Sequence, residues 1–274
     1  MNKVIILDYG MYLHRSIFAS VNNPKIPSTY TCLNMMISNL KKIGIDPDDR
    51  IIVAVDEGRS WRKDIETSYK ANRKAAREKY PINWTEEYQK FNDLLDSIDQ
   101  ATDWNVIAIK GLEADDIMAV GSRYFKDNEV ILVTFDSDLE QMWAYNNVKI
   151  FSPTKKFKGG KGAYKIPPPN FNVYKLLSKK IEKETADNLV NPVLTQADYE
   201  KRKTVVSLLE LPENIENAVK EKLSTLEDKE PNIDLLPFRT IREKIMSIYN
   251  SDKIITYEQC VERLKKQKRK KAKK

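Results

Sequence analysis

Nine carboxylates of this chain lie at or near the ends of expected strands, or at the start of an expected helix. They are spread over most of the sequence: Asp8, Asp56, Glu113, Asp115, Asp116, Asp136, Asp138, Glu184 and Asp187. Carboxylates brought together in this way repel one another unless cations offset their charge. Hard oxygen ligands suit magnesium or manganese, and two such ions about 3.5–4 Å apart are a common device for cleaving a phosphodiester. The pattern therefore predicts a centre for two Mg²⁺ or Mn²⁺ ions.

Two short segments carry five of these acids. Residues 111–119 (GLEADDIMA) place three acids just after a strand, and residues 134–141 (TFDSDLEQ) place two more after another strand. Either segment alone could be an ordinary helix start, where acids complement the helix dipole or cap the first turn. Because both occur in one chain, each following a strand, metal binding is the favoured interpretation.

A basic segment follows the strand that ends at Asp56. Residues 59–79 hold eight Lys or Arg against three acids, with two aromatic residues, Trp61 and Tyr69, between them. A charge run is most often a solvated helix face. Here it is expected to overhang the acids, where basic side chains would bind phosphates and an aromatic ring could stack on a base. Lys70 and Arg73 are spaced i, i+3 and would share one face of a helix.

Strand and helix patterns alternate through the first 151 residues. Buried strands are expected at 3–8, 51–56, 105–109, 129–135 and 148–151, and helices near 30–43, 63–78, 84–99 and 113–126. This alternation predicts an α/β fold with a central, mostly parallel twisted sheet flanked by helices. In such sheets the active crevice lies beyond the carboxyl ends of the strands, where Asp8, Asp56, Glu113 and Asp136 fall.

The character of the chain changes after residue 151. Residues 152–169 read as a basic Gly/Pro loop, and helices are expected at 171–183, 196–210, 213–225, 235–249 and 257–265. The sequence thus divides into an α/β portion at 1–152, a helical portion at 153–264, and a basic tail at 265–274 that is expected to be disordered.

Composition narrows the classes of function. The net charge is +7, but the last ten residues hold eight Lys or Arg, and the rest carries 39 basic against 40 acidic residues. A single histidine, His14, nearly excludes chemistry based on a His dyad or triad. No apolar run approaches the roughly 20 residues of a membrane helix. Two cysteines without metal-ligand spacing indicate free thiols and a cytoplasmic location.

The order of the motifs resembles the structure-specific 5′-nucleases. It runs strand-Asp8, strand-Asp56, WRKD…YKANR at 61–73, EADD at 113–116 and TFDSD at 134–138. That family includes flap endonucleases, the 5′-exonuclease domains of DNA polymerases and the ribonucleases H of T-even bacteriophages, whose pattern is the most similar. The resemblance continues through NVKIFSP at 147–153 and through 194–215, and so covers most of the chain.

The resemblance implies a PIN-like catalytic core at 1–152 with a helical arch near 59–100, and a DNA-binding portion at 153–264 with a shortened helix-turn-helix element. It also implies a metal-dependent 5′-nuclease that removes RNA primers on DNA and cleaves 5′ flaps or 5′ ends of DNA in replication. One metal would be held by Asp8, Asp56, Glu113 and Asp115. The second would be held by Asp116, Asp136, Asp138 and Asp187. Lys70 and Arg73 would hold the scissile phosphate. The expected nucleic-acid contacts in the basic segment are Arg62, Lys63, Tyr69, Lys74 and Arg77.

The same resemblance suggests DNA and RNA·DNA duplexes as partners, a single-stranded-DNA-binding protein as a further partner, no membrane contact and a monomer. The chain also departs from the family. Its usual GD..DN segment is matched by KETADN at 183–188, with Glu184 in place of the first Asp, and the glycine-rich turn that should follow is absent. This leaves open how the duplex is bound and whether Glu184 contributes to metal binding.

Two alternatives belong to other classes. A catalytically weakened nucleic-acid-binding scaffold of the same fold would explain the missing turn, although unused carboxylates would only cost stability. A small-molecule phosphohydrolase of the haloacid-dehalogenase type would need a second Asp two positions after Asp8, where this chain has Gly10.

Overall fold

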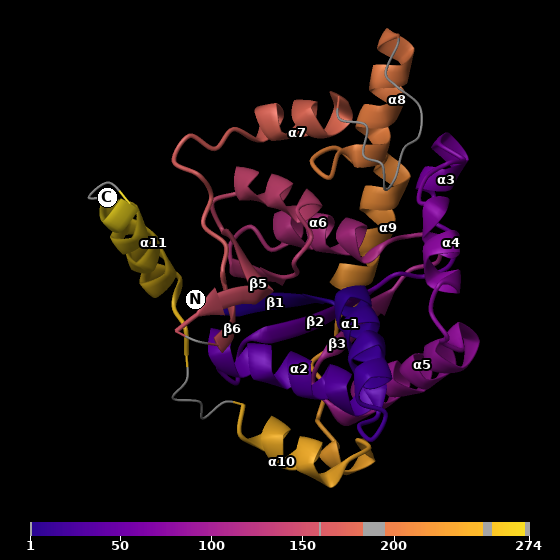
Figure 1. Ribbon diagram of the computed structural model, residues 1–274, viewed down its shortest axis with the longest axis vertical. Coiled ribbons are helices and arrows are strands. Elements are labelled where there is room, and N and C mark those ends of the chain that lie inside the picture. The colour runs from indigo at the N-terminus through magenta and orange to yellow at the C-terminus, as the bar shows by residue number, and fades with distance from the viewer. Residues whose placement is uncertain (1, 159, 183–194, 249–253, 272–274) are drawn as a thin grey trace.

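The computed structural model describes residues 2–158, 160–182, 195–248 and 254–271, except for the side chains of residues 74 and 76. Six strands form one sheet in the order β3-β2-β1-β4-β5-β6 (Figure 1). The strands are β1 (Lys3–Asp8), β2 (Arg50–Val55), β3 (Asn105–Ala108), β4 (Glu129–Val133), β5 (Val148–Phe157) and β6 (Gly160–Tyr164). All neighbours are parallel except β5 and β6, which form an antiparallel hairpin. The predicted mostly parallel α/β fold is confirmed.

Helices cover both faces of the sheet (Figure 1). They are α1 (Tyr9–Asn22), α2 (Ser28–Ile43), α3 (Arg62–Ile65), α4 (Asn72–Glu78), α5 (Trp84–Ala101), α6 (Ala114–Tyr124), α7 (Val173–Glu182), α8 (Gln196–Val206), α9 (Glu213–Ser224), α10 (Arg239–Met246) and α11 (Tyr257–Lys271), with 3₁₀ turns η1 (Asp138–Ala144) and η2 (Ile233–Leu235). In Figure 1, α6 and α9 lie on one side of the sheet, and α1, α2, α5 and α10 lie on the other.

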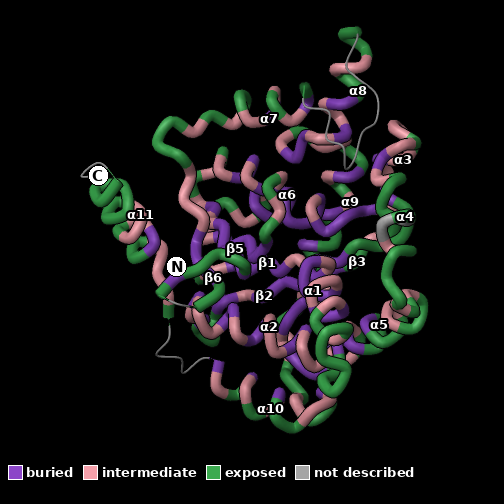
Figure 2. Tube along the Cα trace, viewed as in Figure 1, coloured by how far each residue is buried: buried purple, intermediate pink, exposed green. Residues whose placement is uncertain are grey.

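The central strand β1 supplies both hydrophobic cores. Its side chains alternate, as they must in a strand. Ile5 and Leu7 pack with α1, α2 and α5 in one core, while Val4 and Ile6 pack with α6 and α9 in the other. All four are 3% exposed or less. Figure 2 accordingly shows the strands buried at the centre and the outer turns of the helices exposed. Because β1 is buried on both faces, its sequence at residues 4–7 is a continuous apolar run and does not alternate with polar residues.

The order of the strands creates a reversal between β1 and β4. From β1 the chain moves outward through β2 and β3, then returns to place β4 on the other side of β1. Ligands of open α/β sheets bind at such a reversal, beyond the carboxyl ends of the strands. Asp8 ends β1, and Asp136 follows β4 by three residues, so the fold places both at this point.

Several sequence-based expectations about elements were wrong. Helix α1 was not predicted, and the expected 152–169 loop instead contains the second half of β5 and all of β6. The expected helix at 63–78 is two short helices, α3 and α4, joined by turns. The tail expected to be disordered from 265 is helical to Lys271, because α11 continues through it. The predicted ligand Asp187 and its neighbour Glu184 lie outside the described residues.

Candidate functional site

Four carboxylates from four segments converge at the carboxyl edge of the sheet. Asp8 ends β1, Asp56 follows β2, Asp115 lies in the first turn of α6, and Asp136 follows β4. Burial raises the pKa of Asp8 to about 6, and the charges of Asp56 and Asp136 act in the same direction. Burial, and then the charges of Asp136 and Asp8, also raise the pKa of Asp115 well above its ordinary value. These four residues, here called the acidic centre, are an unbalanced negative cluster, which a cation would stabilise.

Gly10 leaves room for a ligand between two of these carboxylates. A Cβ built on Gly10 would lie 3.5 Å from Asp56 Oδ2 and 3.6 Å from Asp8 Oδ1. Oxygens from two different strands therefore face the same small space, and any side chain at this position would enter it. A space lined by carboxylate oxygens that only glycine keeps open fits a hard cation.

Hydrogen bonds fix the orientation of the acidic centre. Asp8 Oδ2 accepts from Thr134 Oγ1 at 3.0 Å, and Asp56 Oδ1 accepts from the backbone N–H of Ala114 at 2.7 Å. Asp136 Oδ1 accepts from the backbone N–H of Asp138 at 2.8 Å. Since a carboxylate has about four lone-pair sites, each of these groups is held in place while retaining lone pairs for a metal.

Glu113 lies beside the acidic centre but is paired with cations of the basic segment. Its Oε2 accepts from Arg62 Nη1 at 2.8 Å and from Tyr69 Oη at 3.0 Å, and its Oε1 pairs with Lys70 Nζ. Burial opposes ionisation of this carboxyl, but Lys70 and Arg62 outweigh burial and hold its pKa below the usual range. Glu113 is therefore ionised at neutral pH and joins the basic segment to the start of α6.

Lys70 reaches Glu113 from an unusual backbone conformation. Its φ is +55°, in the left-handed region that residues with a side chain rarely adopt. Strain of this kind persists only where the surroundings over-determine it and is common at functional sites. The turn between α3 and α4 thus holds the ammonium group of Lys70 against the edge of the acidic centre.

Asp116 points away from the acidic centre into the protein interior. It is fully buried, and Arg62, which is 2% exposed, donates to both of its oxygens, Nη2 to Oδ1 at 2.7 Å and Nη1 to Oδ2 at 3.1 Å. Trp61 Nε1 and the backbone N–H of Glu113 also donate to Oδ2, each at 3.0 Å. The protein itself therefore supplies four donors to this carboxylate.

The end of α8 is tied to both sides of the site. Arg62 Nε donates to the Val205 carbonyl at 2.8 Å. Gln141, in the η1 turn that follows Asp136, is fully buried; its Nε2 donates to the Val206 carbonyl and its Oε1 accepts from the Leu208 N–H, both at 3.0 Å. The segment at 205–208 is therefore held by a buried side chain from the basic segment and by another from the Asp136 turn. Sequence reasoning did not single out Gln141, and only its spacing within η1 could have indicated a buried face.

A cavity of about 290 Å³ opens beside the acidic centre. Asp56 and Glu113 line one part of it, and basic side chains of the 59–79 segment line another: Lys63, Lys70, Arg73 and Arg77. His14 also lines the cavity, but burial, followed by the charges of Arg77 and Arg73, lowers its pKa to about 4, so it is neutral at pH 7. Acids on one wall and bases on another form a surface that can hold a phosphate while cations bind the carboxylates.

The described part of the chain contains no group of three or more His, Cys, Asp or Glu side chains placed closely enough to hold a metal ion. Asp138 instead pairs with Lys180 of α7, and Glu113 pairs with Lys70. Repulsion between like-charged carboxylates favours such separation and such lysine partners. The ligand set expected from the sequence therefore stays a prediction.

Comparison with known proteins settles the family. Residues 3–165 match the family described as "5'-3' exonuclease, N-terminal resolvase-like domain", a stretch that covers more than half of the chain and includes the whole acidic centre. The chain belongs to the 5′-3′ exonuclease family. The part of it that the structure describes includes no helix long and apolar enough to cross a membrane.

Two curated members of the family show detectable sequence similarity. Ribonuclease H of Enterobacteria phage T4 is 30% identical over 128 residues, which is 45% of this chain and 42% of that protein. A 5'-3' exonuclease of Mycoplasmopsis pulmonis is 28% identical over 143 residues, 51% of this chain and 45% of that protein. The chain thus matches less than half the length of these relatives.

Solved structures of phage T5 proteins share the fold. The match to a phage T5 protein co-crystallised with metal ions covers 82% of this chain and 99% of that protein, with a TM-score of 0.59 and 16% identity. The match to a T5 flap endonuclease complexed with DNA and metal ions covers 92% of this chain and 94% of that protein, with a TM-score of 0.53 and 19% identity. At sequence identities this low, the similarity shows a shared fold and nothing more.

Within this family fold, the predicted site residues fall into three groups, apart from Asp138, which pairs with Lys180. The structure brings together Asp8, Asp56, Asp115 and Asp136, with Glu113 at their edge and Lys63, Lys70, Arg73 and Arg77 along the cavity. It places Arg62, Tyr69 and Asp116 in the interior, each 8% exposed or less. The side chain of Lys74 and all of Asp187 lie outside the described residues.

The interior placement corrects two expectations for the basic segment. Arg62 has its guanidinium committed to Asp116, Glu113 and Val205, so it presents no face to a nucleic acid. Tyr69 is buried with its hydroxyl on Glu113 and cannot stack on a base. A sequence signal for Asp116 did exist: an acid three residues after Glu113 is the spacing of a capping box, in which the second side chain turns back to the helix start.

Proposed function

We propose that this chain is a divalent-metal-dependent 5′-nuclease that hydrolyses phosphodiesters of RNA primers on DNA and of 5′ flaps or 5′ ends of duplex DNA. The observation that carries the proposal is the acidic centre at the strand reversal, directly beside a cavity lined by Lys63, Lys70, Arg73 and Arg77. The names ribonuclease H and 5'-3' exonuclease of the relatives, and the DNA in the T5 flap endonuclease complex, support this class of substrate.

We assign metal binding to the acidic centre together with Glu113, Asp138 and Asp187. The Gly10 space and the raised pKa values of the buried carboxylates support this assignment. Asp116 is left out, because Arg62, Trp61 and a backbone N–H already occupy its oxygens. Bound divalent ions supply Lewis-acid stabilisation of the phosphate and activation of the attacking water.

The chain's own cations would bind and orient the substrate. Lys70 and Arg73 lie on the cavity wall facing Asp56 and Glu113, where they would neutralise charge developing on the scissile phosphate. Lys63 and Arg77, on the same wall, would hold adjoining phosphates. Arg62 is a positioning residue: it fixes Glu113 and the first turn of α6 through its pair with Asp116. Hydrolysis would add water across the P–O3′ bond and leave a 5′-phosphate and a 3′-hydroxyl.

Cleavage of two 5′-labelled substrates, a flap duplex and an RNA·DNA hybrid, tests the proposal. Each is incubated with MgCl₂ or with EDTA, using the wild type, Asp136→Asn and, as a matched control, Asp127→Asn at an exposed position. We expect magnesium-dependent cleavage that Asp136→Asn reduces by at least a hundredfold and Asp127→Asn leaves unchanged. Salt-sensitive binding of both substrates without cleavage would replace the nuclease with a nucleic-acid-binding scaffold.

A further inference from the structure

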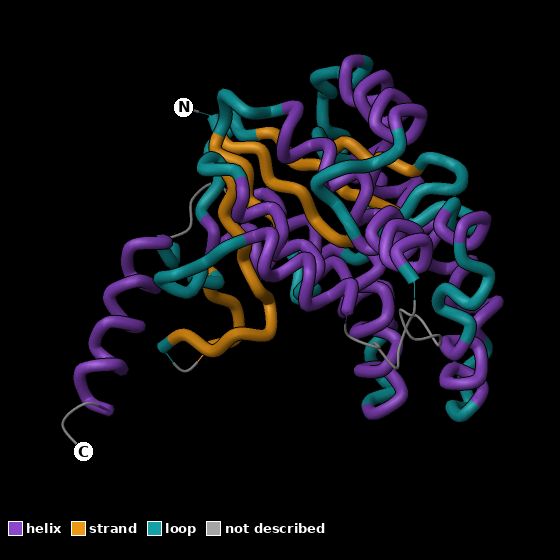
Figure 3. The backbone as a smooth tube through the Cα atoms, turned by 90° about the horizontal axis from the view of Figure 1, so that it is seen from above, coloured by secondary structure: helices purple, strands orange, loops and turns teal. Residues whose placement is uncertain are grey.

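A second concentration of positive charge lies on the other side of the acidic centre from α3 and α4. It consists of residues 155–158 and 160–161 of the β5–β6 hairpin and of helix α11, and is here called the basic arm. The second half of α11, residues 265–271, reads KKQKRKK, with no acid and no apolar residue. Figure 2 shows this half of α11 exposed, and Figure 3 shows the hairpin leaving the body of the sheet to end near α11.

Helix α11 is docked on the hairpin in a defined orientation. Arg263 Nη1 donates to the Lys156 carbonyl at 2.6 Å, and its guanidinium lies 5.3 Å from the centre of the Phe157 ring. Cys260 is 6% exposed and, with Leu264, lines a narrow groove of about 80 Å³ against the hairpin. Cys260 and Leu264 of α11 are therefore used for docking, while residues 265–271 are exposed.

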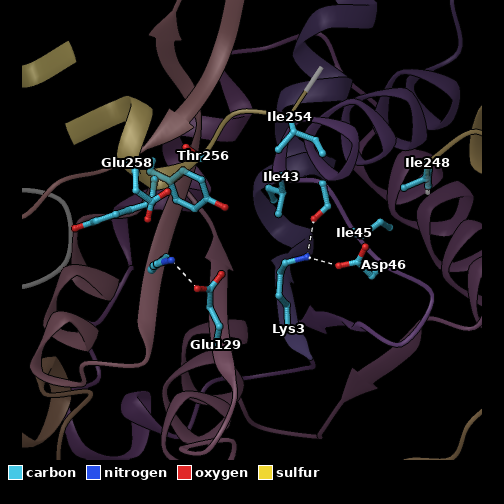
Figure 4. A pocket seen from close by; sticks show the side chains of 13 residues that line it. Lys3, Ile43, Ile45, Asp46, Glu129, Ile248, Ile254, Thr256 and Glu258 are labelled. Carbon is cyan, nitrogen blue, oxygen red and sulfur yellow. Dashed lines mark hydrogen bonds and ion pairs between the residues drawn. The ribbon is translucent and has the colours of Figure 1, made fainter. Parts of the chain in front are cut away.

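The start of α11 is also anchored to the sheet. Figure 4 shows Thr256 and Glu258 lining a pocket with Glu129 at the amino-terminal edge of the sheet. Lys149, which pairs with Glu129 at 2.5 Å, lies 5.2 Å from the centre of the Tyr257 ring. Because both the start and the middle of α11 are held, the charges of its second half occupy a fixed place relative to the hairpin.

The charges of the basic arm are poorly compensated. Lys156 and Lys161 stand directly opposite each other in the β5–β6 pair, and like charges in that position destabilise a hairpin. Among the described acids, Glu262 alone makes an ion pair with this surface, at 3.9 Å from Lys266. An arrangement that costs stability in the free protein becomes favourable once an anion lies across it.

Strand β5 and Lys165 link the basic arm to the edge of the sheet where the acidic centre lies. Strand β4 ends opposite Phe151, and β5 continues to Phe157, a run that can reach about 20 Å. Lys165, just after β6, donates to the carbonyls of Phe135 and Asp136, both at 3.1 Å. Beyond Arg263, which contacts Lys156, helix α11 continues for eight residues and adds about 12 Å. The arm is therefore long enough to contact several consecutive phosphates that lead away from the site.

We propose that the basic arm binds the phosphodiester backbone of duplex nucleic acid outside the cleavage site. The proposal rests on the proposed function, because the duplex is the one that enters the acidic centre. A regular row of lysine and arginine without acids suits a polyanion of evenly spaced charge. A helix that binds membranes in their interfacial plane needs an exposed apolar face beside its basic one, and α11 has used its apolar side chains against the hairpin. The arm offers duplex affinity independent of the glycine-rich turn that the sequence lacks.

Salt-dependent binding of a 20-base-pair DNA duplex in EDTA tests the proposal without any cleavage. The variants are Lys156→Ala/Lys161→Ala and Lys265→Ala/Arg269→Ala, and the matched control is Lys25→Ala/Lys126→Ala, which removes two exposed lysines elsewhere. Each arm variant should make the negative slope of log K against log salt shallower by about 1.8, so that raising salt fourfold weakens the wild type about 12-fold more than the variant.

The outcomes separate this proposal from the nuclease proposal. Arm variants that match the control in affinity and in slope would overturn the basic arm as a duplex-binding surface, whatever the flap assay shows. Loss of binding to phosphatidylserine vesicles, with duplex binding intact, would overturn it equally. If the wild type binds the duplex through the basic arm but cleaves neither substrate, the inference about the arm holds and the proposed nuclease function is wrong. Melting temperatures of all variants show that each one is folded.

Discussion

Replacement of Arg62 separates the role that the structure gives this residue from the role expected from the sequence. Arg62→Ala would leave Asp116 fully buried without its charged partner and would remove a donor from Val205. Breaking a buried ion pair by removing one partner costs about 3–5 kcal/mol. Lys63→Ala, one residue along the chain, removes a charge from the cavity wall and should cost less than about 0.5 kcal/mol.

Urea unfolding followed by circular dichroism measures this difference. With a slope of about 3 kcal/mol per molar urea, the loss in Arg62→Ala lowers the unfolding midpoint by about 1–1.7 M. The double variant Arg62→Met/Asp116→Leu replaces the pair with apolar groups and should recover most of the loss, since such replacements are often neutral. The losses of unfolding free energy in the two single variants would then add up to at least about 2 kcal/mol more than the loss in the double variant, which is the coupling expected of a buried pair.

A different result would refute the reasoning. If Arg62→Ala unfolds at the wild-type urea concentration and instead weakens duplex binding as Lys63→Ala does, then Arg62 faces the nucleic acid. The positioning role of the Arg62–Asp116 pair would then be wrong, and Asp116 would return to the set of candidate metal ligands.

Three further predictions concern the acidic centre. Gly10→Ala places a methyl group 3.5–3.6 Å from the oxygens of Asp56 and Asp8. Because position 10 lies in helix α1, the change should raise the free energy of unfolding by about 0.4–1 kcal/mol, yet it should weaken Mn²⁺ binding measured by calorimetry. Unchanged Mn²⁺ affinity would contradict the proposed position of the metal. Lys70→Ala should lower the single-turnover cleavage rate about a hundredfold with little change in duplex affinity, whereas Lys79→Ala, also in the basic segment, should change neither; a normal Lys70→Ala rate would remove its catalytic role. Burial raises the pKa of Asp8 to about 6, so protonation of Asp8 favours the folded state. This stabilisation, up to about 3 kcal/mol, is complete below pH 4 and is lost as the pH rises through 6. The melting temperature of the wild type in EDTA should therefore fall from pH 5 to pH 7 more steeply than that of the wild type in MgCl₂ or of Asp8→Asn, and parallel curves would refute this.

The sheet was predictable because its strands are buried on both faces. Runs such as residues 4–7 and 130–133 are continuously apolar, and the acids that follow them indicated the position of the crevice. Helix α1 was missed because it begins at Tyr9, immediately after β1, with no loop to mark the boundary; Asp8 serves as both strand end and N-cap through its bond to the Met11 N–H.

Other features could not be read from residue types. Residues 148–164 are rich in Lys and Gly, a composition typical of a loop, but strands β5 and β6 are held by their antiparallel pairing and by contact with α11. The difference between Asp115 and Asp116 is one of direction. Successive positions of a helix point about 100° apart, so one carboxylate faces the acidic centre and the next faces Arg62. Sequence spacing placed both acids at the right helix start but could not say which one the interior would hold.

The position of β1 at the centre of the sheet has a consequence for how the chain folds during synthesis. Val4 pairs with Val130, so one edge of the first strand has no neighbour until 126 more residues have been added. At about 5–20 residues per second, that wait lasts roughly 6–25 s. Pairings of such long sequence separation also carry a high entropic cost and form late. Asp8 and Asp136 can therefore meet only after β4 has been made, and a nascent chain shorter than this carries no assembled acidic centre.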